Sequence, residues 1–141
     1  MAGPRHAGFV ETLGLRETEI ERGVVRCQLA VTEAHQNIQG VIHGSVIVAL
    51  LDTAMGHALS GTLVLDEFCS TTQFSVQFLR ACRPGDLLVA TGRVTRRGSR
   101  IAYMEGTCAN ADGEEVARAH GTWYVGRRSE RARRAQQGIE P

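Results

Sequence analysis

The sequence predicts an α+β fold in which a curved antiparallel sheet wraps around one long central helix. Residues 43–60 have a helical pattern with almost no polar face, and such a helix must be buried on most sides. Two strand-like segments precede this helix and four follow it, and their short links are typical of antiparallel pairing. A single helix this apolar needs a sheet around it.

Length and composition indicate one globular domain. The chain has 141 residues, of which 43% are hydrophobic and 22% are charged. Its net charge of +1 gives no reason to expect nucleic acid as a partner. All 16 basic residues are arginine, so Schiff-base catalysis by a lysine is excluded.

The order of elements follows from periodicity and turn residues. A short helix is expected at residues 7–13, and two strands joined at Gly23 over residues 14–33. A loop at 34–42 leads into the long helix, which Ser45 or the preceding turn can cap and Gly61 can end. Strands are expected within 69–82, 87–98, 99–113 and 114–126, with turns at residues 83–86, 97–99 and 110–113.

The ends of the chain and its cysteines suggest an ordinary intracellular domain. Residues 1–126 are expected to form the domain, followed by an arginine-rich, flexible tail at 127–141, with phosphate binding by the tail as a lesser possibility. The four cysteines lack zinc-ligand spacing and are expected to be reduced. The N-terminus lacks the pattern of a signal peptide, and no apolar run is long enough to span a membrane, so a cytoplasmic location is expected.

One polar pattern interrupts the apolar helix. Asn37 is followed by His43-Gly44 and then by Asp52, nine residues after the histidine. This segment resembles the PaaI-like acyl-CoA thioesterases of phenylacetate degradation, and the order of elements resembles their hotdog fold. Residues 70–86 and 111–125 resemble the family's next strand and its closing hairpin. The second glycine of the family's His-Gly-Gly is Ser45 here, a difference expected to affect substrate preference more than activity.

The residue types in this pattern suit thioester hydrolysis. Gly44 lies where a long helix begins, and its free N–H groups and the helix dipole can form an oxyanion hole. Asp52 is a candidate general base or nucleophile, and burial would strengthen a carboxylate as a base. Asn37 can bind the carbonyl region or orient water, and His43 can brace the turn or contact the thioester. The resemblance implies a hydroxyl that holds the nucleophilic water, for which register favours Thr71 over Thr72.

Spacing predicts that such a site is shared between two chains. Gly44 and Asp52 are eight residues apart, which is about 12 Å along a helix. Reacting groups must lie within about 3–3.5 Å, so one thioester cannot contact both residues of one helix. Two helices packed antiparallel in a twofold dimer would bring them together. The resemblance implies the same homodimer, often paired again as a homotetramer.

The substrate expected from the resemblance is an aryl- or medium-chain acyl-CoA, and no metal or cofactor is expected. Coenzyme A carries phosphates, for which arginines are suitable partners. The candidate substrate-binding residues are Ser45, Thr72, Arg80, Arg83, Arg96, Arg97 and Arg100.

Two alternatives remain open at this point. The first is a hydratase or dehydratase acting on acyl thioesters, which needs a histidine and a carboxylate at one carbon. Spacing does not exclude it, because His43 and Asp52 can meet across a dimer. The second is a non-catalytic acyl-CoA-binding module, which Asp52 argues against because a binder gains nothing from a carboxylate facing a thioester.

Overall fold

The computed structural model describes residues 8–138 and contains six strands and three α-helices within that range. Residues 1–7 and 139–141 lie outside the described residues. The expectation that the N-terminus is not a signal peptide therefore concerns residues that are partly outside the described range. The strands are β1 (Arg16–Glu21), β2 (Val24–Ala30), β3 (Glu67–Phe78), β4 (Leu87–Arg97), β5 (Ile101–Ala109) and β6 (Glu115–Arg127). The helices are α1 (Phe9–Leu13), α2 (Gly44–Ser60) and α3 (Arg128–Gln136), with a 3₁₀ turn η1 at Glu33–His35.

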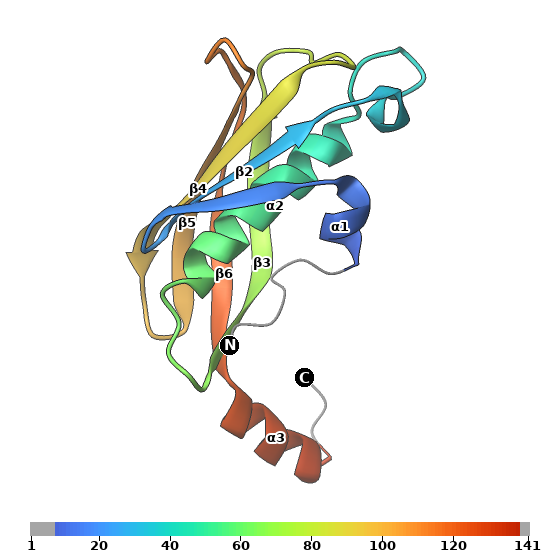
Figure 1. Ribbon diagram of the computed structural model, residues 1–141. Helices are drawn as coiled ribbons and strands as arrows, with labels where there is room; N and C mark the ends of the chain where they lie inside the picture. The colour runs from blue at the N-terminus through green and yellow to red at the C-terminus, as the bar shows by residue number, and fades with distance from the viewer. Residues whose placement is uncertain (1–7, 139–141) are drawn as a thin grey trace.

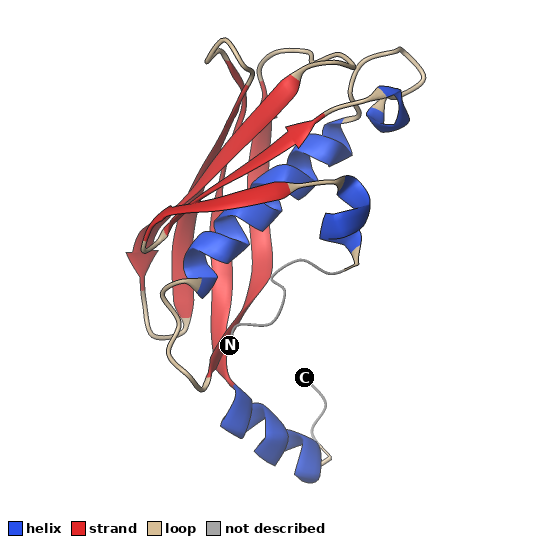
Figure 2. Ribbon diagram, in the orientation of Figure 1, coloured by secondary structure: helices blue, strands red, loops and turns tan. Residues whose placement is uncertain are grey.

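The six strands form one antiparallel sheet that curves around α2, as expected (Figures 1 and 2). The strand order is β1-β2-β4-β5-β6-β3. The chain enters β3 directly after α2, yet β3 pairs with β6 and not with its neighbour in sequence, β4. The turn between β3 and β4 is therefore a connection across the sheet and not a hairpin, and β3 becomes an edge strand.

The core lies between the concave face of the sheet and one side of α2. The buried side of the helix carries its large side chains, namely Ile47, Leu50, Leu51, Ala54, Met55, Ala58 and Leu59. The opposite side carries small or polar residues and is only half-buried in a single chain. The sequence predicts a helix that is buried on most sides. In a single chain, the sheet covers only one side of α2.

Two glycines allow the sheet to approach α2 closely. Gly92 of β4 pairs with Gly106 of β5 in the middle of the sheet. A Cβ added at Gly92 would lie 2.3 Å from the backbone of Ala54, and one at Gly106 would lie 3.1 Å from the side chains of Leu51 and Met55. The backbone of α2 at Gly92, and its side chains at Gly106, therefore occupy the space that a Cβ would need.

Residues 128–136, within the tail that was expected to be flexible, form α3. The segment is rich in arginine, glutamate and alanine, all of which favour helix. Asp66, in the loop before β3, accepts hydrogen bonds from the N–H and the hydroxyl of Ser129 at 3.1 and 2.6 Å. A carboxylate at a helix N-terminus satisfies free N–H groups and complements the helix dipole.

Candidate active site

The N-terminus of α2 is capped by a histidine. His43 Nδ1 accepts a hydrogen bond from the Ser45 backbone N–H at 3.1 Å. The backbone N–H of His43 donates to the His35 carbonyl at 2.8 Å. Since Nδ1 is an acceptor here, the neutral imidazole carries its proton on Nε2. The exposed His43 ring therefore presents an N–H donor to solvent at the start of the helix.

Gly44 is the first residue of α2 and lines a shallow hollow of about 350 Å³. A Cβ at this position would lie 3.3 Å from the Phe78 ring, so glycine keeps the helix start in contact with β3. Phe78 is not among the site residues predicted from the sequence, although it alternates with Phe74 and Val76 and so shares one face of the strand with them. The hollow is lined by Ile42, Gly44, Ile47, Phe78, Leu79, Arg80, Ala81 and Cys82.

Asn37 closes the turn that precedes the helix. Its Oδ1 accepts hydrogen bonds from the Gln39 N–H at 2.9 Å and the Val41 N–H at 3.4 Å, and its own N–H donates to the Val41 carbonyl at 2.8 Å. Gly40 has a φ of 77°, which a side chain would make costly. The Asn37 side-chain oxygen thus braces the turn, and only the amide NH₂ remains to donate to a substrate.

Asp52 lies on the open side of α2, where it is half-buried and not enclosed by the apolar core. Its Oδ1 accepts a hydrogen bond of 2.8 Å from the Thr71 hydroxyl on β3. Thr72, the other candidate hydroxyl, falls at a β-bulge between Thr71 and Gln73, where the register with β6 shifts. Of the two threonines it is therefore Thr71 whose hydroxyl bonds Asp52.

Within one chain the structure keeps Gly44 and Asp52 apart. Phe78 packs at Gly44 and Thr71 bonds Asp52, so β3 runs antiparallel to α2 and links both ends of the pattern. Gly44 and Asp52 are separated by two helical turns, or about 12 Å. The N-terminal turn and the carboxylate of one helix therefore do not meet.

Two of the candidate arginines, Arg80 and Arg83, lie at the end of α2 that holds Gly44. Arg80 lines the hollow at Gly44 and forms an exposed ion pair of 3.4 Å with Glu114. Arg83 donates its backbone N–H to Asp86 at 2.8 Å in the turn before β4. Arg80 is thus the arginine of this set that borders the candidate site in a single chain.

The other three arginines lie at the opposite end of the helix, around the β4–β5 turn. The Arg97 guanidinium pairs with Glu67 at 2.7 Å, and Arg100 makes a bidentate pair with Glu130 at 2.7 and 3.0 Å. Arg96 is exposed on β4. The charges of Arg97 and Arg100 are therefore already compensated by carboxylates.

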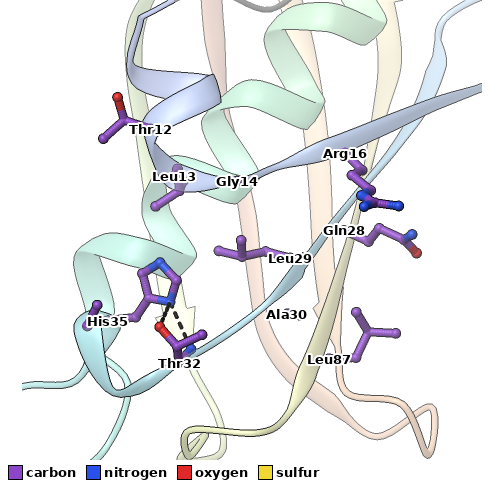
Figure 3. Close-up of a pocket in the computed structure, with 11 residues that line it drawn as sticks. Thr12, Leu13, Gly14, Arg16, Gln28, Leu29, Ala30, Thr32, His35 and Leu87 are labelled. Carbon is purple, nitrogen blue, oxygen red and sulfur yellow. Dashed lines mark hydrogen bonds between the residues drawn. The ribbon is translucent and has the colours of Figure 1, made fainter.

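A larger hollow of about 570 Å³ lies away from Asp52, between α1, β2 and η1 (Figure 3). His35 closes one side of it, where its Nδ1 accepts the Thr32 N–H at 2.9 Å, and Arg16 and Gln28 lie on the other side. None of the residues of the His43–Asp52 pattern lines this hollow. A site shared between two chains would be incomplete in one chain, so the size of a hollow does not identify it.

Two absences concern the described residues alone. Over residues 8–138, no three histidine, cysteine, aspartate or glutamate side chains gather as a metal site would require. No helix in this range is long and apolar enough to cross a membrane.

The family profile described as Thioesterase superfamily matches residues 39–117, which include Gly44, Asp52 and Thr71. A Deinococcus radiodurans protein named "Putative esterase" is 32% identical over 120 residues, covering 84% of this chain and 80% of its own.

Solved structures share the fold over most of the chain. A phenylacetic acid degradation-related protein of Ralstonia eutropha JMP134 has a TM-score of 0.75 and 29% identity, covering 82% of this chain and 87% of its own. The smu.793 protein of Streptococcus mutans UA159, solved with acetyl CoA bound, has a TM-score of 0.79 and 25% identity over 90% of this chain and 98% of its own. The hotdog fold expected from the sequence is therefore confirmed.

Proposed function

The chain belongs to the thioesterase superfamily and is a thioester hydrolase of the PaaI-like type, and from this premise we propose that it hydrolyses aryl- or medium-chain acyl-CoA at a site shared by two subunits. The acetyl CoA bound to the Streptococcus mutans relative supports an acyl-CoA substrate. The observation that carries the proposal is the Thr71–Asp52 hydrogen bond, which holds a carboxylate on the open side of α2.

The groups at the two half-sites, at Gly44 and at Asp52, divide the reaction between them. The Gly44 N–H, at the positive end of a helix dipole, would donate to the thioester oxygen and stabilise the negative charge that develops there. The His43 Nε2–H is a second donor at the same turn. Ser45 and Val46 already donate their N–H groups to His43, which leaves Gly44 as the donor closest to the hollow.

Asp52 would act on the carbon of the thioester in one of two ways. As a general base it takes a proton from water, whose oxygen bonds the carbonyl carbon, and the C–S bond then breaks to release the CoA thiolate. As a nucleophile its own oxygen bonds the carbon and the thiolate leaves, after which water hydrolyses the anhydride. In both routes the Thr71 hydroxyl holds Oδ1 and leaves Oδ2 to react.

The open side of α2 supports an antiparallel helix pair. Gly44, Val48, Asp52 and Gly56 recur every fourth residue along it, and small residues allow two helices to approach closely. A twofold axis at Val48 would place Gly44 of one chain beside Asp52 of the other.

The edge strand supports the same axis. Phe78 and Thr71 are the β3 neighbours of Gly44 and Asp52, and the midpoint between them falls at Phe74 and Ser75. An edge strand presents unpaired backbone groups, and antiparallel pairing of β3 with its copy around that midpoint would satisfy them. The proposed assembly is thus a dimer with two sites, and sedimentation would show whether dimers pair further. A monomer with full activity would contradict it.

The function is tested by release of thiol from a panel of aryl- and alkyl-CoA esters, with the wild type and with Asp52→Asn. We expect cleavage by the wild type and a loss of at least about 100-fold in kcat for Asp52→Asn, typical of a lost acid–base group. Cleavage of no ester, or equal rates for both proteins, would refute the proposal. Hydration of an enoyl-CoA without thiol release would indicate the hydratase alternative instead.

Sharing of the site is tested by mixing two inactive variants. Asp52→Asn and Gly44→Val homodimers each lack one half of every site. A heterodimer of the two contains one intact site, formed by the remaining Gly44 and the remaining Asp52. Refolding the two together should therefore restore activity, whereas a site within one chain would give none.

A further inference from the structure

A separate hollow of about 560 Å³ lies between α3 and the outer face of the sheet, on the side of β3 and β6 away from α2. Figure 1 shows α3 continuing from the end of β6. A volume of this size suits a small-molecule ligand. The hollow is lined by Phe68, Ser70, Tyr124, Arg127, Glu130, Arg131, Arg134 and Ala135.

The side of α3 that lines the hollow is cationic. Arg127, Glu130, Arg131, Arg134 and Ala135 recur at helical spacing and so share one face. A helix that packs against a sheet usually buries an apolar face there. In α3, by contrast, no residue is buried. The helix and the sheet therefore leave a space between them where packed helices would leave none.

Polar contacts hold this wall of the hollow in place. The Arg128 N–H donates to the Asp66 carbonyl at 2.8 Å, and Ser129 bonds the Asp66 carboxylate. The bidentate pair between Arg100 and Glu130 ties the first turn of α3 to the β4–β5 turn. The hollow is thus defined by fixed contacts at the start of the helix.

The positive charge in the hollow is only partly compensated by carboxylates. The Glu130 carboxylate is already bound by Arg100, and Arg127 lies within electrostatic range of Asp66, Glu67 and Glu130. Among the side chains that the structure describes, no carboxylate lies within ion-pair distance of Arg131 or Arg134. These two arginines, one helical turn apart, are suited to bind an anion.

The other wall of the hollow is aromatic. Phe68 and Tyr124 meet edge to face with ring centroids 6.1 Å apart, and the Arg131 guanidinium lies 5.8 Å from the Phe68 centroid. An arginine over a ring uses its flat face and keeps its N–H edge free for a phosphate. The pocket therefore combines surfaces for a planar ring with donors for phosphate.

We propose that this hollow binds the phosphorylated adenosine end of coenzyme A, with the base against Phe68 and Tyr124 and the phosphates on Arg131 and Arg134. The inference rests on the proposed function, because it assigns a second part of the same substrate. Phe68 lies three residues before Thr71, about 10 Å along the strand, a span that an extended pantetheine arm can bridge. Residues 67–70 also lie outside the proposed pairing of β3 with its copy in the dimer. The pantetheine arm can therefore pass along the edge of β3 at these residues.

Binding is tested by calorimetry with adenosine 3′,5′-bisphosphate and the full chain. Arg131→Gln/Arg134→Gln should weaken binding at least about tenfold, the loss expected for charge-assisted hydrogen bonds. The matched control is Arg128→Gln/Arg133→Gln, which removes the same charge from α3 outside the hollow and should bind as the wild type does. No binding by the wild type, or equal losses in both variants, would overturn the proposal. Tighter binding of ATP than of the bisphosphate would assign the hollow to a free nucleotide and overturn the link to coenzyme A.

Kinetics separate this proposal from the proposed function. For one acyl group, KM of the CoA ester should rise about tenfold in Arg131→Gln/Arg134→Gln with kcat unchanged. The N-acetylcysteamine ester, which lacks the nucleotide, should react equally with both proteins. If the double substitution changed the kinetics of the CoA ester and of the N-acetylcysteamine ester equally, or changed neither, the inference would be overturned. The proposed thioesterase activity would be unaffected by that result. Binding of the bisphosphate by a protein that cleaves no thioester would leave the nucleotide pocket in place and refute the hydrolase proposal.

Discussion

The Thr71 hydroxyl donates a hydrogen bond of 2.8 Å to Oδ1 of Asp52, and so joins an edge strand to the open side of the central helix. The bulge that follows Thr71 lets the strand change register at this point without losing the contact. One carboxylate oxygen is held and the other remains available. This arrangement is what a carboxylate needs in order to act in a fixed direction.

Replacing Thr71 should lower kcat more than stability. Thr71→Val keeps the shape but removes the donor, and a hydrogen bond to a charged group is worth about 1.5–3 kcal/mol, or about 10- to 100-fold in rate. Thr71→Ser keeps the hydroxyl and should retain most of the activity. Thr107→Val, an exposed threonine of β5, is the control for loss of a strand hydroxyl. An equal fall in kcat for Thr71→Val and Thr107→Val would contradict a positioning role.

His43 should have two separable roles. Its Nδ1 caps α2, so His43→Ala should lower the free energy of unfolding by about 1 kcal/mol, a typical cost of a lost cap. His43→Asn keeps a capping oxygen and should unfold nearly as the wild type does, but it lacks the Nε2–H. Urea unfolding and thiol release together measure both roles. We expect both variants to lose kcat and only His43→Ala to lose stability; full activity in His43→Asn would limit the residue to capping.

Close contact between β4 and α2 makes Gly92 sensitive to any side chain. A Cβ there would lie 2.3 Å from the Ala54 backbone, so helix and strand must move apart. Gly92→Ala should therefore destabilise the fold by at least about 1–3 kcal/mol, the usual cost of overpacking. Gly113→Ala is the control, because it separates the effect of backbone strain from that of crowding. Gly113 has a φ of 81°, and apart from its chain neighbours no atom lies within 4 Å of a Cβ added there. A thermal midpoint for Gly92→Ala equal to that of the wild type would refute the close approach.

The sequence predicted the elements well because local patterns decide them. The apolar run of residues 43–60, the alternation in residues 69–82 and the glycine turns each have a local physical cause, and the helix and strands form there. The pattern from Asn37 to Asp52 was also visible, because its residues lie on one turn and one helix. The position of β3 beside β6 was not, since short links alone suggest that neighbouring strands pair.

Side-chain partners across the fold could not be read from the sequence. The use of Arg97 and Arg100 in pairs with Glu67 and Glu130 depends on strands brought together by folding. The same holds for α3: its composition permits a helix, but its arginine-rich face suggested a solvated tail. Contacts with distant parts of the chain, such as that of Ser129 with Asp66, 63 residues earlier, and that of Glu130 with Arg100, fix the helix in the folded protein.

The anchor of α3 should weaken in acid. Hydrogen bonds from the Ser129 hydroxyl and N–H lower the pKa of Asp66 below its ordinary value of 3.8, and nearby arginines add to the effect. A carboxyl whose pKa is lowered on folding stabilises the folded state above its ordinary pKa. That contribution is lost as pH falls from 3.8 through the folded pKa. The Ser129 amide resonance should therefore titrate with a midpoint below 3.8, and Asp66→Asn should abolish this titration. A midpoint at or above 3.8 would show that the ionised carboxylate does not hold the start of α3.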